Sequence, residues 1–170
     1  MITLTHIRIR DHYKIMADML HQLHLSEKEY FPATAAWEDI ADNYMQHVIE
    51  MQEEYEGTCI VAWDRDKPVG FIFAYLEYPD ESRIEDYTGD TLYVSDGYVA
   101  PDYRQMGIYR SMNEDLENKY IAQGIRRMVR YTLTNNKRMQ AFLTSKNYTA
   151  VRLVYEKWLT PDGQEPKKIF

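Results

Sequence analysis

Residues 99–110 read Val99-Ala100-Pro101-Asp102-Tyr103-Arg104-Gln105-Met106-Gly107-Ile108-Tyr109-Arg110. In this segment a strand ends, a short basic turn follows and a helix begins. The first N–H groups of a helix lack carbonyl partners and lie at the positive end of its dipole, so they bind anions. Gly107 lets the backbone approach a ligand, and Arg104 and Arg110 flank the turn. The segment therefore predicts an anion site; the alternative is a helix start whose glycine and arginines serve packing and solubility.

Strands and helices alternate on both sides of this segment. Residue spacing predicts a strand at 3–10, a helix capped by Asp11 that ends at about Leu25, and a helix between Thr34 and Gly57. It then predicts strands at 59–63, 69–76 and 91–99, a helix from about Gln105 to Gly124, a strand at 128–133, a short helix capped by Asn135 or Asn136, and a strand at 148–158. Turn residues 64–67 make a hairpin, and residues 79–90 form a loop. We therefore expect the α/β (α+β) class around one central sheet.

The strand at 91–99 carries the polar side chains nearest to the predicted anion site. Simple alternation places Leu92, Val94, Asp96 and Tyr98 on one side, opposite Tyr93, Ser95, Gly97 and Val99. Asp96 is the only carboxylate in this strand, where it could cap the adjoining turn, pair with an arginine or act as a base.

Composition limits the class of protein. The 170 residues are 45% hydrophobic, which suits one core, so we expect a single domain over 1–170 with a polar tail at about 160–170. Cys59 is the only cysteine, which excludes an internal disulfide and a multi-cysteine zinc site. His21 and His24 have no evident third ligand nearby, so no metal site is predicted.

The opening residues do not have the pattern of a secretion signal, and no apolar run approaches the roughly 18 residues of a membrane span. We therefore expect a cytoplasmic protein that does not enter a membrane. The net charge of −7 argues against nucleic acid as a partner. Residues 1–85 carry 7 basic and 17 acidic side chains, and residues 86–170 carry 13 basic and 10 acidic ones. The two halves either face ligands of opposite sign or are ordinary solvated surfaces.

From about Thr3 to Trp158 the order of elements resembles the GNAT superfamily of acyl-CoA-dependent N-acetyltransferases. The family's signature Q/R-x-x-G-x-G/A after a V-x-P strand end is similar to Val99-Ala100-Pro101 followed by residues 104–109. Tyr109 replaces the last small residue, so either its ring turns away from the pyrophosphate or the cofactor lies differently. The second signature, N-x-x-A-x-x-x-Y-x-x-x-G-F, falls on Asn136, Met139, Leu143, Asn147 and Tyr148.

The resemblance implies a GNAT-like fold, with a central mixed, mostly antiparallel twisted sheet of six to seven strands flanked by about four helices. It implies acetyl-CoA as cosubstrate, contacted by Val99, Arg104, Gln105, Met106, Gly107, Ile108, Tyr109, Arg110 and Asn136. Of these, Asn136 would contact the pantetheine arm, and backbone N–H groups of the strand ending at Val99 would face the thioester oxygen.

The resemblance also identifies a departure at Leu143, where many family members have a tyrosine that protonates the departing thiolate. Leucine cannot donate a proton, so water or another tyrosine would replace it. The catalytic residues we predict are Asp96 as base and Tyr98 acting through a water chain.

Three functions follow from these observations. The first is an N-acetyltransferase that moves acetyl from acetyl-CoA to a primary amine, either a small cationic amine or a peptide amine, by direct attack in a ternary complex. The second is a catalytically impaired GNAT-fold module that binds CoA or a partner, consistent with Leu143 and Tyr109. The third is a structural homodimer that pairs through the edge of strand 148–158.

Overall fold

The computed structural model describes residues 1–79 and 86–159. It divides into two compact units, residues 1–135 and residues from 136 onward. The first contains β1 (Ile2–Ile7), a 3-10 turn (Arg10–His12), α1 (Tyr13–Lys28), α2 (Trp37–Glu54), β2 (Thr58–Asp64), β3 (Lys67–Glu77), β4 (Thr91–Val99), a second 3-10 turn (Pro101–Tyr103), α3 (Ile108–Ala122) and β5 (Arg127–Val129). The second contains α4 (Lys137–Ser145).

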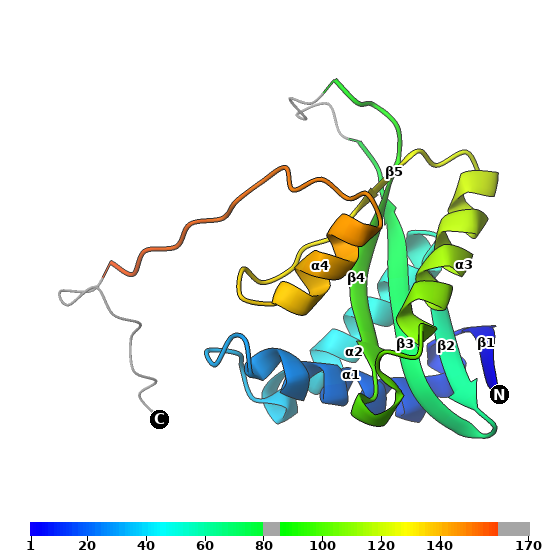
Figure 1. The fold of residues 1–170 in the computed structure, drawn as a ribbon. Helices are drawn as coiled ribbons and strands as arrows, with labels where there is room; N and C mark the ends of the chain where they lie inside the picture. The colour runs from blue at the N-terminus through cyan, green and yellow to red at the C-terminus, as the bar shows by residue number, and fades with distance from the viewer. Residues whose placement is uncertain (80–85, 160–170) are drawn as a thin grey trace. The chain divides into compact units, whose positions relative to one another are not determined.

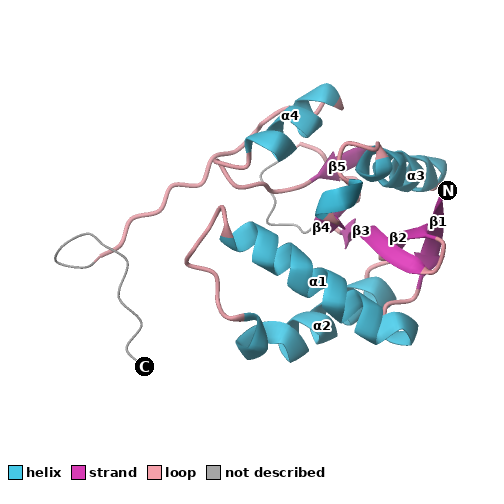
Figure 2. Ribbon diagram, turned by 60° about the horizontal axis from the view of Figure 1, so that its bottom comes forward, coloured by secondary structure: helices cyan, strands magenta, loops and turns pink. Residues whose placement is uncertain are grey.

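One sheet organises the first unit, with its strands in the order β1-β2-β3-β4-β5 (Figure 1). The first four strands pair antiparallel, with β2 and β3 joined by a tight hairpin, and β5 pairs parallel to β4 after the α3 crossover. Figure 2 shows α1 and α2 on one face of the sheet and α3 on the other. The sheet is therefore covered on both faces, which explains the nearly continuous apolar run of β3.

Each face of the sheet has its own core. The core beneath α1 and α2 includes Ile9, Met16, Leu20, Met45, Val48, Phe71 and Phe73. The core beneath α3 includes Ile60, Ile72, Leu92, Met112, Leu116 and Tyr120. Burying one large apolar side chain contributes about 1.5–3 kcal/mol, so these two layers supply most of the driving force for folding.

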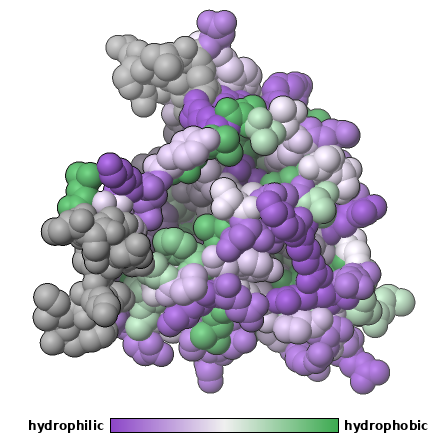
Figure 3. Space-filling model, turned by 60° about the vertical axis from the view of Figure 1, so that its left-hand side comes forward, coloured by the Kyte–Doolittle hydropathy of each residue, from purple (hydrophilic) through white to green (hydrophobic). Residues whose placement is uncertain are grey.

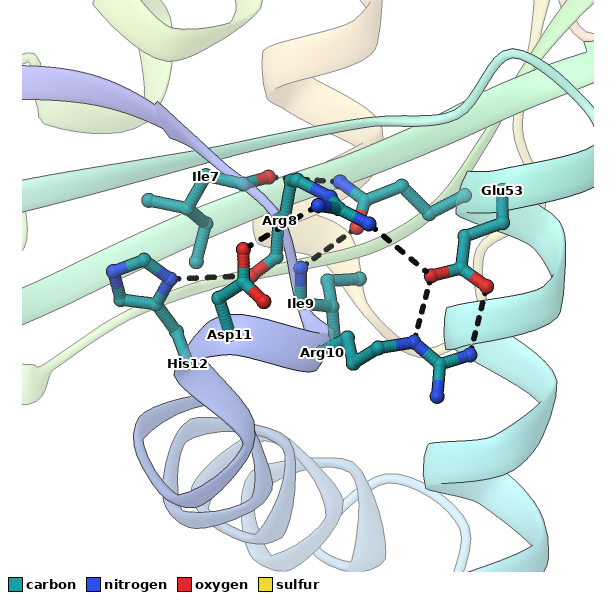
Figure 4. Close-up of polar contacts among 8 residues, drawn as sticks. Ile7, Arg8, Ile9, Arg10, Asp11, His12 and Glu53 are labelled. Atoms are coloured by element: carbon teal, nitrogen blue, oxygen red, sulfur yellow. Dashed lines mark hydrogen bonds and ion pairs between the residues drawn. The ribbon is translucent and has the colours of Figure 1, made fainter.

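The end of β1 is fastened to α2 by polar contacts (Figure 4). The Gln52 side chain accepts a hydrogen bond from the Ile9 N–H at 2.7 Å and donates one to the Ile7 carbonyl at 2.8 Å. Beside it, the Arg10 guanidinium donates two hydrogen bonds to the Glu53 carboxylate, at 2.8 and 2.7 Å. Gln52 thus satisfies two backbone groups where the chain leaves the sheet, which fixes the start of α1 against α2.

Several predicted elements are confirmed with small shifts in their bounds. Strand β4 has the predicted residues, the hairpin turns between Asp64 and Lys67, and α3 follows the basic turn. The predicted cap by Asp11 is wrong, because neither the first 3-10 turn nor α1 has a side-chain cap at its start. Part of the predicted loop at 79–90 lies outside the described residues.

The strands predicted after α3 are the main error. The first, predicted at 128–133, is a strand only at Arg127–Val129, the three residues that pair with β4. Residues 149–159 have no regular secondary structure and are exposed, so the described sheet has five strands rather than six or seven. A strand needs a neighbour for its backbone groups, and alternating side chains alone do not supply one. The edge at 148–158 from which a homodimer is predicted is therefore not a strand in the described residues, and the homodimer itself stays a prediction.

In the second unit, Asn136 caps α4 as one of the two predicted alternatives, because its side-chain oxygen accepts a hydrogen bond from the Met139 N–H at 3.1 Å. Asn147 has a φ of +63°, the left-handed conformation that asparagine tolerates better than most residues.

Across the described residues, no helix combines the length and apolar character needed to span a bilayer. On the face drawn in Figure 3, hydrophilic residues cover most of the surface and surround smaller hydrophobic patches.

Candidate functional site

A bulge in β4 decides which side chains share a face of the sheet. Phe73 and Ala74 of β3 are consecutive, but they pair with Asp96 and Val94 of β4, so Ser95 is an extra residue. The extra residue reverses the alternation beyond it. Leu92 and Val94 pack beneath α3, whereas Asp96 and Tyr98 turn toward α1 and α2. The prediction that all four lie on one side is therefore wrong, because period-two alternation fails at a bulge.

Asp96 is enclosed beneath the two N-terminal helices and is only 6% exposed. The Tyr44 hydroxyl of α2 donates a hydrogen bond to its Oδ1 at 2.6 Å, and the Ser95 hydroxyl donates one to its Oδ2 at 2.6 Å. Burial raises the pKa of Asp96, and the two hydrogen bonds and the nearby His47 only partly oppose that shift. A carboxylate with a raised pKa is better suited to accept a proton near neutral pH than an exposed one.

Tyr98 lies two residues beyond Asp96 in β4 and is buried in the core beneath α1 and α2. Burial raises the pKa of Tyr98, and the nearby Arg104 opposes this weakly. Its phenol therefore stays protonated near neutral pH, which suits donation of a hydrogen bond rather than removal of a proton.

Strands β4 and β5 stay together only over their first residues. The register pairs Thr91 with Arg127, Leu92 with Met128 and Tyr93 with Val129, and no described strand of the first unit pairs with β4 beyond Tyr93 on that side. The second half of β4, which contains the bulge, thus presents one backbone edge that the sheet does not use. A linear ligand with amide groups can bind such an edge by the hydrogen bonds that a strand would make.

The basic turn after β4 leads directly from this edge to α3. Gly107 is the N-cap of α3 with a φ of +79°, and no side chain caps the helix. A Cβ at Gly107 would meet no atom within 4 Å, so the space in front of the helix start is open. The Arg104 Nε donates a hydrogen bond to the Val99 carbonyl at 3.0 Å, which holds this guanidinium at the end of β4. Gln105, Met106 and Arg110 are exposed around the same turn.

Tyr109 packs inward from the first turn of α3. A Cβ at Gly97 would lie 2.6 Å from its hydroxyl oxygen, so the ring occupies the space that glycine leaves on β4. Arg130 donates one hydrogen bond to this hydroxyl at 2.7 Å and another to the Asn113 side chain at 2.8 Å. The ring thus lies against the sheet, and its place relative to a cofactor pyrophosphate stays a prediction.

The structure therefore brings most of the predicted residues together within the first unit. Asp96, Tyr98, Val99 and the turn at 104–110 follow one another along β4 and into α3. Ile108 is buried as the first residue of α3. Asn136 belongs to the second unit, where its side chain caps α4, and its contact with a cofactor stays a prediction.

Two partners of this site were missed by reasoning from the sequence. Tyr44 follows the apolar spacing of α2, so nothing in its position predicted that its hydroxyl reaches Asp96. Arg130 lies in a predicted strand, and only the structure shows that it donates a hydrogen bond to the Tyr109 hydroxyl. A tyrosine on an otherwise apolar helix face is a weak signal for a buried polar partner.

Other candidates have structural partners. His21 stacks on Trp37 with ring centres 5.4 Å apart, and His24 is 2.8 Å from the Ala35 carbonyl. Cys59 is buried in the core, and burial raises the pKa of its thiol. A cavity of about 590 Å³ is lined by residues of the β1 end, the α2 end, the start of β2 and Lys119 of α3, and it contains none of the predicted site residues.

Comparison with known proteins identifies the family and the fold of this chain. The acetyltransferase (GNAT) family matches residues 17–147. Among solved structures, an aminoglycoside N-acetyltransferase AAC(6')-Iy in complex with CoA has a TM-score of 0.67 and 13% identity, covering 94% of this chain and 96% of that one. A putative acetyl transferase from Pyrococcus furiosus has a TM-score of 0.70 and 15% identity, covering 92% of this chain and 100% of that one.

A third structure, an aminoglycoside acetyltransferase meta-AAC0020 from an uncultured soil metagenomic sample in complex with sisomicin, has a TM-score of 0.64 and 15% identity, covering 94% and 95%. The TM-scores of these three structures establish a shared fold, and identities this low establish nothing further. No curated protein sequence matches. Because the family match covers more than half of the sequence and the fold agrees, the chain belongs to the GNAT family of acetyltransferases.

Proposed function

We propose that this protein transfers an acetyl group from acetyl-CoA to a primary amine by direct attack in a ternary complex. The observation that carries the proposal is the parting of β4 and β5 after Tyr93, directly before the open N-terminus of α3. This arrangement offers a backbone edge for an extended amide-containing arm and an anion site at the end of that edge. CoA has both chemical features.

The turn at 104–110 is the proposed site for the CoA pyrophosphate. Gly107 leaves open space in front of α3, and the helix start lacks a side-chain cap. Arg104 is held at the end of β4 by the Val99 carbonyl, and Arg110 is exposed in the first turn of α3. Support also comes from the AAC(6')-Iy structure, which shares this fold at 13% identity and contains CoA.

Asp96 is the proposed general base. It takes a proton from the acceptor ammonium, directly or through one water, and the neutral nitrogen then attacks the thioester carbon. A C–N bond forms and the C–S bond breaks, and the nitrogen passes its surplus proton through water to the departing thiolate, because Leu143 has none to give. Backbone N–H groups on the unpaired edge of β4 are the proposed donors to the developing oxyanion.

The acceptor class we propose is a small cationic amine. The acidic balance of residues 1–85 favours encounter with a cation. Two solved structures with this fold are aminoglycoside acetyltransferases, one with CoA and one with sisomicin. A peptide amine is the alternative acceptor, and peptide substrates belong in the same screen.

The test is titration calorimetry with acetyl-CoA and with CoA, followed by thiol release in the presence of amines. We expect micromolar binding of both and thiol release that depends on an amine. Binding without release for any amine would favour the catalytically impaired module, for which Leu143 is the specific argument. Absence of binding would overturn the cofactor site.

A further inference from the structure

A small cavity lies between α1 and α2 above β4. Its volume is about 50 Å³, and its lining residues are Leu20, Leu23, His24, Glu27, Trp37, Ile40, Tyr44 and Asp96. Asp96 is almost fully buried, whereas Glu27 is exposed near the end of α1. The cavity thus has a buried carboxylate at its base and a second carboxylate at its opening.

The two carboxylates influence each other. Partial burial and then the charge of Asp96 raise the pKa of Glu27, and burial raises the pKa of Asp96. Tyr44 and Ser95 donate to Asp96, which uses two of the roughly four acceptor positions of an ionised carboxylate. A cation between the two groups would relieve their repulsion and use the remaining positions.

The rest of the lining suits an organic cation. Trp37 contacts His21 and His24 with ring centres 5.4 and 5.7 Å away, and it lies 6.3 Å from Tyr44. Aromatic faces attract ammonium groups, and the remaining lining side chains are apolar. No lysine or arginine lines the cavity, and His24 lies within hydrogen-bond distance of the Ala35 carbonyl. The charge of His24 acts to lower the pKa of Glu27 and that of His47 to lower the pKa of Asp96, but the pKa of each carboxyl stays raised.

The cavity is large enough for a charged nitrogen. About 10–15 Å³ of such space holds one water-sized group, so 50 Å³ admits an ammonium group and the carbon attached to it. We propose that this cavity binds the amino group of the acceptor as an ammonium ion and that Glu27 is the residue that positions it above Asp96. The inference rests on the proposed acetyl transfer, and it adds the residue that holds the amino group before transfer.

In this arrangement the ammonium group donates hydrogen bonds to both carboxylates. It then loses one proton to Asp96, which becomes neutral, while Glu27 keeps its charge. The neutral amine is released toward the unpaired edge of β4, where the thioester is proposed to lie. Glu27 therefore acts before the chemical step, on amine binding.

A binding experiment tests the cavity without any catalysis. Replacing Trp63 and Trp158 by Phe leaves Trp37, a lining residue, as the only tryptophan fluorophore. We expect 1-aminobutane to change its emission in a saturable way and 1-butanol, its neutral counterpart, to have no such effect. Glu27→Gln should weaken amine binding about 10-fold or more, the usual value of a hydrogen bond to a charged group. Glu29→Gln, at the exposed C-cap of the same helix, is the matched control.

An equal response to the alcohol, no response to any 1-aminoalkane, or an unchanged affinity in Glu27→Gln would overturn the inference. Steady-state kinetics distinguish a failure of the cavity inference from a failure of the proposed acetyl transfer. Glu27→Gln should raise KM for the amine about 10-fold, with kcat and KM for acetyl-CoA unchanged. Active transfer with an unaltered amine KM refutes the cavity alone, whereas ammonium binding without transfer to any amine refutes the proposed function alone.

Discussion

The pKa of Asp96 is the result of opposing effects. Burial favours its neutral form, while the hydrogen bonds from Tyr44 and Ser95 favour its charged form, and burial is the larger effect on its pKa. A folded-state pKa above the unfolded value means that the protonated carboxyl stabilises the fold at low pH. This contribution is lost as the pH rises through the folded-state pKa. A costly buried carboxylate next to an unpaired strand edge is typical of a functional group rather than a structural one.

The first prediction concerns this carboxylate. Asp96→Asn should lower kcat/KM for the amine by about 100-fold or more, because the amide cannot accept the proton. The acid limb of the pH profile that belongs to Asp96 should disappear with it. Steady-state thiol release measured against pH tests this, with Asp42→Asn on the exposed face of α2 as control. An unchanged profile would show that another group removes the proton.

The second prediction concerns Tyr44, which acts through Asp96. Its hydroxyl stabilises the charged form of that carboxylate, so Tyr44→Phe should raise the pKa of Asp96 further. The acid limb should therefore move to higher pH, and activity should recover at alkaline pH because the base itself remains. Loss of activity at every pH, with the limb in place, would instead indicate a purely structural role for Tyr44.

Among the elements, two features of β4 position the proposed site: the bulge at Ser95 and the short pairing with β5. The bulge turns Asp96 toward the helices, and the early end of the β5 pairing leaves the second half of β4 with a free edge. Helix α3 then begins where that edge ends. The proposed base, the proposed amide-binding edge and the N-terminus of α3 thus lie along one continuous stretch of chain.

The third prediction tests the N-terminus of α3. Gly107→Glu places a negative charge where the pyrophosphate is proposed to lie, so it should abolish CoA binding in titration calorimetry. Any side chain at a φ of +79° is strained by about 1 kcal/mol, so Gly107→Ala is the matched control for backbone strain. The alanine variant should keep CoA affinity within a few-fold. Equal loss in both variants would point to a distorted helix start rather than charge repulsion.

At the scale of the whole molecule, charge is distributed unevenly between the halves of the chain. Residues 1–85 carry the acidic excess and contain the cavity residues Glu27, Trp37 and Tyr44, whereas the basic turn lies in residues 86–170. The two proposed substrates have opposite charges, so each meets a region of complementary sign. Such steering is screened by salt over about 8–10 Å at ordinary ionic strength.

The fourth prediction follows from that distribution. Raising the salt concentration should weaken CoA binding and also raise KM for a cationic amine, with a smaller effect on kcat. Calorimetry and steady-state kinetics across a salt series measure both effects. A neutral amine analogue bound with the same salt dependence as the cation would contradict the electrostatic explanation.

Most of the architecture and the turn around Gly107 could be predicted from the sequence, because they depend on local spacing. Apolar residues at helical steps, alternation in strands, and the sequence around Gly107 each act over a few residues. The family signature lies within the same short range. These features established the class of fold, β4, the hairpin and the start of α3.

Tertiary structure alone decided which groups meet. The bulge reversed the face of Asp96, Tyr44 reached it from a helix 52 residues away in sequence, and Glu27 came to the opening of the same cavity. The tyrosine at position 109 packs on Gly97, and residues 149–159 form no strand. Each outcome depends on a neighbour distant in sequence, whether a strand that accepts hydrogen bonds or a space that admits a ring, and residue spacing along one segment carries no information about that neighbour.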